Sequence, residues 1–100
     1  MHARVSTLQM DSARIDDATK QLEEEDLPTL KATDGFKGFT LFADRSTGKC
    51  IGATYWETEE AMKAAEEVGQ SARQRAAETG GATSEPEVER FEVLLDTFAG

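Results

Sequence analysis

The stretch from residue 36 to residue 56, FKGFTLFADRSTGKCIGATYW, constrains the fold more than any other part of the sequence. Its two ends, FKGFTLFA and KCIGATYW, are rich in the β-branched, aromatic and small residues that suit strands. Between them DRSTG supplies turn residues, with Gly48 able to adopt a positive φ. The stretch therefore predicts a β-hairpin. Gly38 and Gly52 interrupt its strands, which marks either a bulge or a close approach of another group to the backbone.

A strand and a helix are predicted before this hairpin. HARVSTLQM, residues 2–10, is rich in strand-forming residues. Asp11 or Ser12 can then cap a helix. Three apolar residues recur at helical spacing after the cap: Ile15, Ala18 and Leu22. The acidic run EEED at 23–26 predicts a solvated helix face, and Pro28 predicts that the helix breaks or bends there.

A second helix and a last strand are predicted after the hairpin. Thr58 is a suitable N-cap, and acidic residues in the first turn suit the helix dipole. One stripe along this helix consists of small or apolar residues: Ala61, Ala65, Val68, Ala72 and Ala76. Gly80 and Gly81 predict its end. The alternating stretch VERFEVLLD, residues 88–96, predicts the fourth strand.

The predicted order is β-α-β-β-α-β, which indicates a single α+β domain over residues 1–100. Four antiparallel strands with two helices on one face is the ferredoxin-like arrangement. The other face of such a sheet would meet water unless something covers it. A second copy of the chain is the simplest cover, so we expect a homodimer.

Composition and charge exclude several classes of partner. Hydrophobic residues make up 38% and charged residues 31% of the chain, as in soluble globular proteins. A formal net charge of −9 disfavours binding to nucleic acid and to anionic membranes. No apolar run is long enough to span a membrane, and the N-terminus lacks the pattern of a signal peptide. A single cysteine, Cys50, cannot form an internal disulfide, so we expect a cytoplasmic protein.

Three segments in this order resemble the antibiotic biosynthesis monooxygenase-like proteins of the dimeric α+β barrel superfamily: GFKGFTLFADRSTGK, TYWETEEAMKA and VERFEVL. The resemblance extends over nearly the whole chain, and its most specific parts are DGFKG and WETEEAM. It implies a homodimer with two sheets packed face to face and a pocket between sheet and helices in each subunit. Some such proteins oxygenate polycyclic aromatic phenols without metal or flavin. Others open haem, isomerise small acids or have no known activity, so the fold does not settle the chemistry.

The resemblance also implies candidate ligand-binding residues. Trp56 matches the family tryptophan at the end of the third strand, while Gly52 and Met62 stand where the cofactor-free oxygenases carry asparagine and tyrosine. Arg73, or its neighbour Arg75, could stabilise an anion by turning inward, although arginines near a helix end also suit the helix dipole. We therefore expect Trp56, Gly52, Met62 and Arg73 to contact a ligand. Trp56 would either pack as a core residue or, as we expect, form the wall of a cavity beside Cys50, Gly52 and Thr54, which share its strand face.

No cofactor is expected. The haem-degrading proteins of this family carry a histidine on the second helix, where this sequence has none; the only histidine is His2. No set of residues has the pattern of a catalytic triad, a metal site or a phosphate-binding loop. Two hypotheses follow: a cofactor-independent monooxygenase acting on an aromatic small molecule, or a non-catalytic small-molecule-binding or structural dimer.

Overall fold

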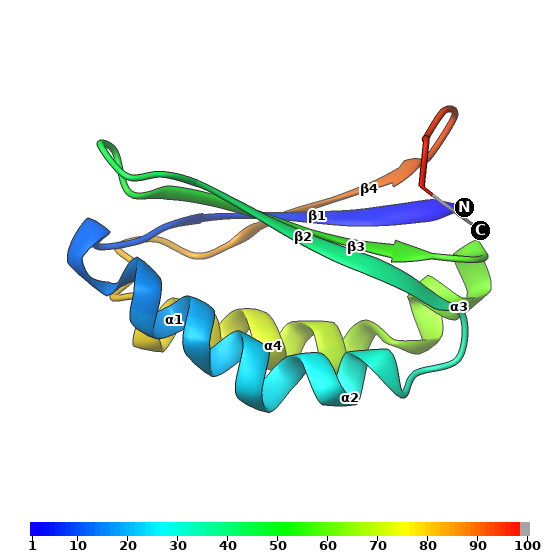
Figure 1. Ribbon diagram of the computed structural model, residues 1–100, viewed down its shortest axis with the longest axis horizontal. Helices are drawn as coiled ribbons and strands as arrows, with labels where there is room; N and C mark the ends of the chain where they lie inside the picture. The colour runs from blue at the N-terminus through cyan, green and yellow to red at the C-terminus, as the bar shows by residue number, and fades with distance from the viewer. Residues whose placement is uncertain (99–100) are drawn as a thin grey trace.

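A four-stranded antiparallel sheet is covered on one face by helices in the computed structural model of the chain, which describes residues 1–98 (Figure 1). The strands are β1 (His2–Gln9), β2 (Phe36–Asp44), β3 (Lys49–Trp56) and β4 (Glu87–Glu92). They lie in the order β2-β3-β1-β4, and every neighbouring pair is antiparallel. The predicted ferredoxin-like arrangement is confirmed.

The hairpin of β2 and β3 forms as its turn residues predict. Gly48 has a φ of 83° and closes the turn, and the register shifts between Phe36 and Gly38, so Gly38 marks a bulge. The fourth strand is shorter than predicted, ending at Glu92 instead of residue 96. The residues after it leave the sheet and turn back over the face opposite the helices (Figure 1). There the ring of Phe98 packs edge-on against Tyr55, with the ring centroids 5.0 Å apart.

The first predicted helix consists of four segments. A short 3-10 turn (Ser12–Arg14) leads into α1 (Ile15–Gln21), a π-helical segment (Leu22–Asp26) and α2 (Leu27–Lys31). Pro28 lies in the first turn of α2, where a missing N–H costs little, so the helix widens before the proline and does not break at it.

Asp26 corrects the prediction that the whole acidic run is solvated. The three glutamates before it are exposed, but Asp26 is only 3% exposed. Its position at the end of the π-helical segment brings it against α4, where Arg75 Nη2 lies 2.7 Å from Asp26 Oδ1. The ion pair with Arg75 offsets part of the cost of burying the Asp26 carboxylate, which the acidic sequence pattern had predicted to face water.

The second predicted helix is two helices, α3 (Glu59–Ala64) and α4 (Glu66–Thr79). Thr58 caps α3 as predicted, its Oγ1 accepting from the N–H of Ala61 at 3.1 Å. The chain bends at Ala65, whose φ and ψ are −95° and 13°. Ala65 is 1% exposed and packs in the cluster around Trp56, so the bend brings α3 over the end of the sheet (Figure 1).

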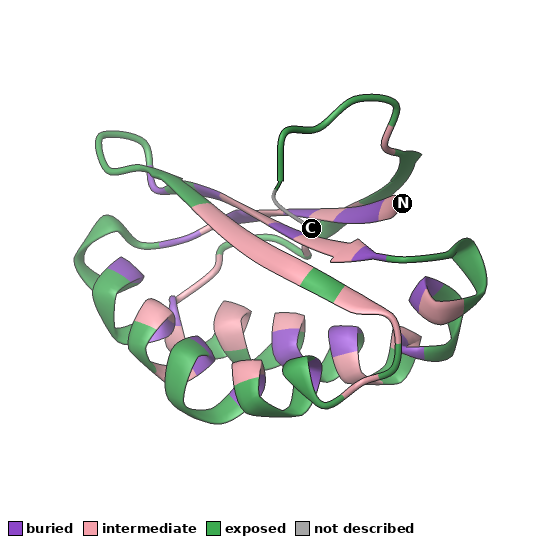
Figure 2. Cartoon of the chain, turned by 45° about the vertical axis from the view of Figure 1, so that its right-hand side comes forward, coloured by how far each residue is buried: buried purple, intermediate pink, exposed green. Residues whose placement is uncertain are grey.

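The core lies between the sheet and the inward side of the helices, where the buried residues of α1, α3 and α4 gather (Figure 2). It has two clusters. One contains Leu8, Met10, Ile15, Ala18 and Cys50, and the other contains Leu30, Trp56, Met62 and Ala65. No helix among residues 1–98 combines the length and the apolar character that crossing a membrane requires.

Candidate functional site

A cavity of about 60 Å³ lies between the sheet and the helices, where all five residues of the first core cluster and Leu30 of the second line it. The sheet contributes alternate residues of its helix-facing side, which the register places in rows across the strands: Arg4, Ser6 and Leu8 from β1, Phe39 and Leu41 from β2, and Cys50, Gly52 and Thr54 from β3. From the opposite layer α4 contributes Gly69, Ala72, Arg73 and Ala76. The helical segments before β2 contribute Ile15, Ala18, Thr19, Leu22 and Leu30, so the cavity lies between one layer of strand side chains and one of helix side chains.

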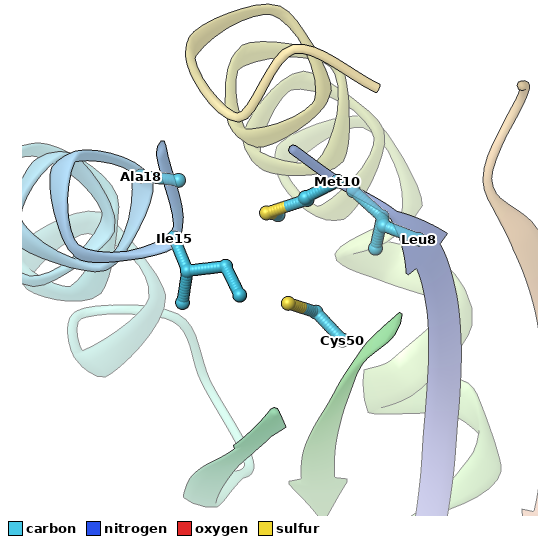
Figure 3. Close-up of a cluster of buried hydrophobic side chains, with 5 residues drawn as sticks. All are labelled: Leu8, Met10, Ile15, Ala18 and Cys50. Carbon is cyan, nitrogen blue, oxygen red and sulfur yellow. The ribbon is translucent and has the colours of Figure 1, made fainter. Parts of the chain in front are cut away.

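One end of the cavity is apolar. The side chains of Met10 and Cys50 point toward Ile15 of α1, with Leu8 and Ala18 beside them (Figure 3). Cys50 is 1% exposed, and burial raises the pKa of its thiol. A thiol that is kept protonated in this way is a small apolar residue and not a nucleophile.

The other end of the cavity is formed by Arg4, which is 2% exposed although it is charged. Its Nη2 donates to the main-chain carbonyl of Met62 and lies 2.8 Å from Oε2 of Glu66. Its guanidinium carbon lies 5.9 Å from the ring centroid of Trp56. Its Nε and Nη1 are buried and have no hydrogen-bond partner within residues 1–98. Arg4, which lines the cavity, therefore has two side-chain nitrogens without an acceptor among the described residues.

Two further arginines share the same carboxylate. Arg73 of α4 has a side chain only 14% exposed, with its Nη2 3.7 Å from Oε1 of Glu66. Arg90 of β4, which pairs directly with Arg4 across the sheet, donates to that oxygen as well. Burial pushes the pKa of Glu66 up, but the arginines, Arg4 foremost, outweigh it and hold that pKa below its ordinary value. Three guanidinium groups thus surround one carboxylate that stays ionised.

Gly69 of α4 makes room for this arrangement. A Cβ at this position would lie 2.5 Å from Nη1 of Arg4 and 3.2 Å from Nη1 of Arg73. Both guanidinium groups therefore lie against the same glycine, and a larger residue would push them away.

The structure brings only two of the four predicted ligand-binding residues to the cavity. Gly52 and Arg73 line it, whereas Trp56 and Met62 do not. Arg73 turns inward, while Arg75, the alternative, is half exposed and pairs with Asp26. Whether Gly52 and Arg73 bind a ligand stays a prediction.

Trp56 occupies the second core cluster, behind Arg4. It is 0% exposed, meets the edge of Phe36 at a centroid distance of 5.4 Å, and donates from Nε1 to Thr54 Oγ1 at 2.9 Å. The expectation that Trp56 walls the cavity is therefore not met, because Arg4 and Thr54 fill the positions between the indole and the cavity. Met62 is 2% exposed in the same cluster and reaches the site only through its carbonyl.

Sequence reasoning did not identify Arg4 and Glu66. A signal for Arg4 was present, since strand alternation puts it on the same face as Ser6 and Leu8. A charged residue in the core row of a strand is rare unless it is paired or functional. Glu66 carries no comparable signal, because it is one of many acidic residues at the start of a helix.

The site does not fit a haem. The one histidine, His2, lies beside Glu59 with Nε2 3.7 Å from Oε2, and it does not line the cavity. A cavity of about 60 Å³ is also far smaller than a macrocycle. Nowhere in residues 1–98 do three side chains of the metal-binding types come together.

The solved structures similar to this chain share its fold. The monooxygenase ActVA-Orf6 of Streptomyces coelicolor, in complex with nanaomycin D, has a TM-score of 0.78 at 16% identity, covering 99% of this chain and 92% of its own. Protein NE2512 of Nitrosomonas europaea, of unknown function, has a TM-score of 0.76 at 16% identity, over 99% and 94%. The haem degrader MhuD of Mycobacterium tuberculosis, with two haems bound in its active site, has a TM-score of 0.72 at 21% identity, over 98% and 100%.

Relatives by sequence occur in Mycobacterium tuberculosis, whereas no protein-family model matches the chain. The uncharacterized protein Rv2557 is 39% identical over 93 residues, which are 93% of this chain and 41% of that protein. The uncharacterized protein Rv2558 is 35% identical over 77 residues, which are 77% of this chain and 33% of that protein. The chain thus spans less than half the length of these relatives. In its architecture it has the fold of the antibiotic biosynthesis monooxygenase-like proteins.

Proposed function

We propose that this chain is a small-molecule-binding α+β barrel module whose ligand occupies the cavity between sheet and helices. The observation that carries the proposal is the cavity itself, which has an apolar end around Met10 and Cys50 and a cationic end at Arg4. Ligand sites commonly combine an apolar lining with a few placed polar groups. The nanaomycin D of ActVA-Orf6 and the haems of MhuD support this proposal, because proteins of this fold hold organic ligands.

A cofactor-independent monooxygenase acting on an aromatic small molecule is the second candidate. Such an enzyme must remove a proton from its substrate and stabilise the resulting oxyanion. No histidine, tyrosine or carboxylate is among the described residues that line the cavity, so no side chain there is suited to take the proton. The free donors of Arg4 favour oxyanion stabilisation, so this activity requires a phenol acidic enough to ionise beside the arginines. The geometry supports binding better than catalysis.

Titration with a panel of one-ring and two-ring phenols and aromatic acids tests both candidates, with fluorescence of the single tryptophan and oxygen uptake recorded together. A saturable fluorescence change without oxygen uptake supports the binding module, and stoichiometric oxygen uptake with an oxidised product supports the enzyme. Ala72→Leu fills the cavity and should abolish the change, because Ala72 lines it, whereas Ala64→Leu on the exposed side of α3 should not. An equal response in both variants would place the binding outside the cavity and overturn the proposal.

We also propose that the chain forms a homodimer through the face of the sheet opposite the helices. Large apolar side chains are exposed on that side, with Phe42 of β2 at 58% and Phe91 of β4 at 49%. The strand register places both on the face that carries Tyr55, away from the cavity. An exposed apolar surface of this kind is typical of a protein–protein interface. A second copy of the chain, packed sheet to sheet, would cover it with an equally apolar surface.

Light scattering at micromolar concentration is expected to give twice the chain mass. Phe42→Glu should convert the dimer into a monomer, because it puts a charge into the apolar interface. Ala64→Glu, on the exposed side of α3, serves as the charge control and should leave the dimer intact. A wild-type monomer at every concentration, or the same mass for wild type and Phe42→Glu, would contradict the sheet-to-sheet dimer.

A further inference from the structure

We propose that the ligand of the cavity is a small organic acid whose carboxylate lies between Arg4 and Arg73 and whose apolar body extends toward Leu8, Met10 and Cys50. This inference rests on the proposed function and adds the chemical class of the ligand. It follows from three features of the site: free donors, unbalanced charge and the small size of the space.

The free donors are Nε and Nη1 of Arg4. Both are buried without a partner in the described part of the chain, while Nη2 of the same group is used by Glu66 and by the carbonyl of Met62. A buried donor left without an acceptor costs free energy, more so on a charged group. A carboxylate presents two acceptor oxygens, one for Nη1 of Arg4 and one for Nη1 of Arg73, which both lie against Gly69, and charge-assisted hydrogen bonds of this kind are the strong ones in proteins.

The charge at this end of the cavity is not balanced. Arg4, Arg73 and Arg90 gather around a single carboxylate, that of Glu66, in a chain whose overall formal charge is −9. Gly69 allows the groups of Arg4 and Arg73 to lie close together, although like charges repel. An arrangement that concentrates cations away from water is costly without a counter-charge. One bound anion between the two inward-facing arginines would lower that cost.

The size and lining of the cavity select the kind of anion. Beyond the arginines its deep end is apolar, so a fully ionised phosphate would leave acceptor oxygens facing Leu8 and Cys50. A carboxylate attached to an apolar body places only its two oxygens at the arginines. A dry cavity of roughly 150 Å³ holds a benzene ring, and this cavity measures about 60 Å³. The body is therefore a short chain or at most one ring, with the flexible Met10 yielding to a ring.

Titrations with benzoate, butyrate and the neutral benzamide, followed by Trp56 fluorescence, test the inference. Trp56 is the one tryptophan of the chain, and its ring lies 5.9 Å from the guanidinium carbon of Arg4. Benzoate or butyrate should saturate the signal and bind at least about tenfold more tightly than benzamide, because a charged hydrogen-bond partner is lost in the amide. Arg73→Gln should weaken binding of the acid by at least about tenfold and leave benzamide unchanged. Lys37→Gln removes the same charge at an exposed residue that does not line the cavity, so it should alter neither.

A second variant keeps the inference testable if Arg73→Gln does not fold. Gly69→Ala retains every charge, but its methyl group displaces the guanidinium groups of Arg4 and Arg73, so it should also weaken binding of the acid. If benzamide binds as tightly as benzoate, the inference that the ligand is a carboxylate is wrong. The proposal that the cavity binds a small molecule would still hold. If none of the three probes binds, the inference fails, and the phenol panel with Ala72→Leu decides separately whether the cavity binds a ligand at all. If Lys37→Gln and Arg73→Gln weaken binding of the acid equally, the positive charges attract the acid only over a long range. That result would also overturn the inference.

Discussion

Trp56→Ala is expected to lower the free energy of unfolding by about 3–5 kcal/mol, the range typical of deep aromatic truncations. The indole is 0% exposed and packs among Leu30 and Met62. Its removal leaves a void next to the buried Arg4 and deprives Thr54 of the indole N–H that it accepts. Urea unfolding measures the change as a shift in midpoint at constant slope.

Two control variants separate packing from other effects of this substitution. Trp56→Phe keeps most of the ring and loses the N–H, so it should cost less than the alanine variant, on the order of a hydrogen bond plus a partial void. Lys20→Ala, at an exposed position of α1, should change stability by less than about 0.5 kcal/mol. A loss for Trp56→Ala close to that of Lys20→Ala would mean that the indole faces open space, as the sequence alone suggested.

The parts of the fold that the sequence predicted correctly are those set by local chemistry. The turn at Gly48, the cap at Thr58 and the bulge at Gly38 each depend on a residue type whose backbone or side chain acts within a few positions. Together with strand and helix periodicity, these signals were enough for the β-α-β-β-α-β order. The α+β class and the placement of the helices on a single face of the sheet followed from that order.

The differences from prediction come from contacts between segments far apart in the sequence. The bend at Ala65 follows from packing against the Trp56 cluster, and the π-helical segment ends at Asp26, which meets Arg75 on another helix. Neither contact leaves a local pattern, so the acidic run looked uniformly solvated and the second helix looked continuous.

The candidate site was predictable only in part, for a related reason. Gly52 lines the cavity because of strand alternation, and Arg73 because one helix face meets the sheet, and both rules operate within a single element. Strand alternation could also have predicted that Arg4 lies on the same face of its strand as Ser6 and Leu8. The position of Arg4 between Thr54 and Arg90, and its sharing of Glu66, depend on the order of three strands and on α4. That part of the site appears only when the elements are assembled.

Arg75→Ala is expected to lower the free energy of unfolding by about 3 kcal/mol at pH 7, at the lower end of the range for breaking a buried ion pair. The Asp26 side chain is 3% exposed, and its oxygen lies 2.7 Å from Arg75 Nη2. Without Arg75 the carboxylate remains buried and uncompensated. The lower end applies because the Arg75 side chain is itself 51% exposed, so water can reach the carboxylate once the arginine is truncated. Thermal and urea unfolding at neutral pH measure this loss.

The pH dependence of the loss identifies its cause. Burial raises the pKa of Asp26, and Arg75 opposes that shift, so removing Arg75 should raise the pKa further. A carboxyl whose pKa is higher in the folded than in the unfolded state binds its proton more tightly when folded. Its destabilising effect is therefore complete above the folded-state pKa and is relieved as the pH falls through that value toward the ordinary aspartate pKa.

The double variant Asp26→Asn/Arg75→Ala isolates this effect from the other carboxylates. Glu66, whose pKa is lowered by its arginines, contributes stability that is lost as the pH falls, and it does so equally in the single and the double variant. The difference in unfolding free energy between Arg75→Ala and the double variant should therefore be largest at neutral pH and shrink in acid. A difference that stays constant from neutral to acidic pH would show that the charge of Asp26 is not what destabilises Arg75→Ala, and the loss relative to wild type would then come from packing of the Arg75 aliphatic stem.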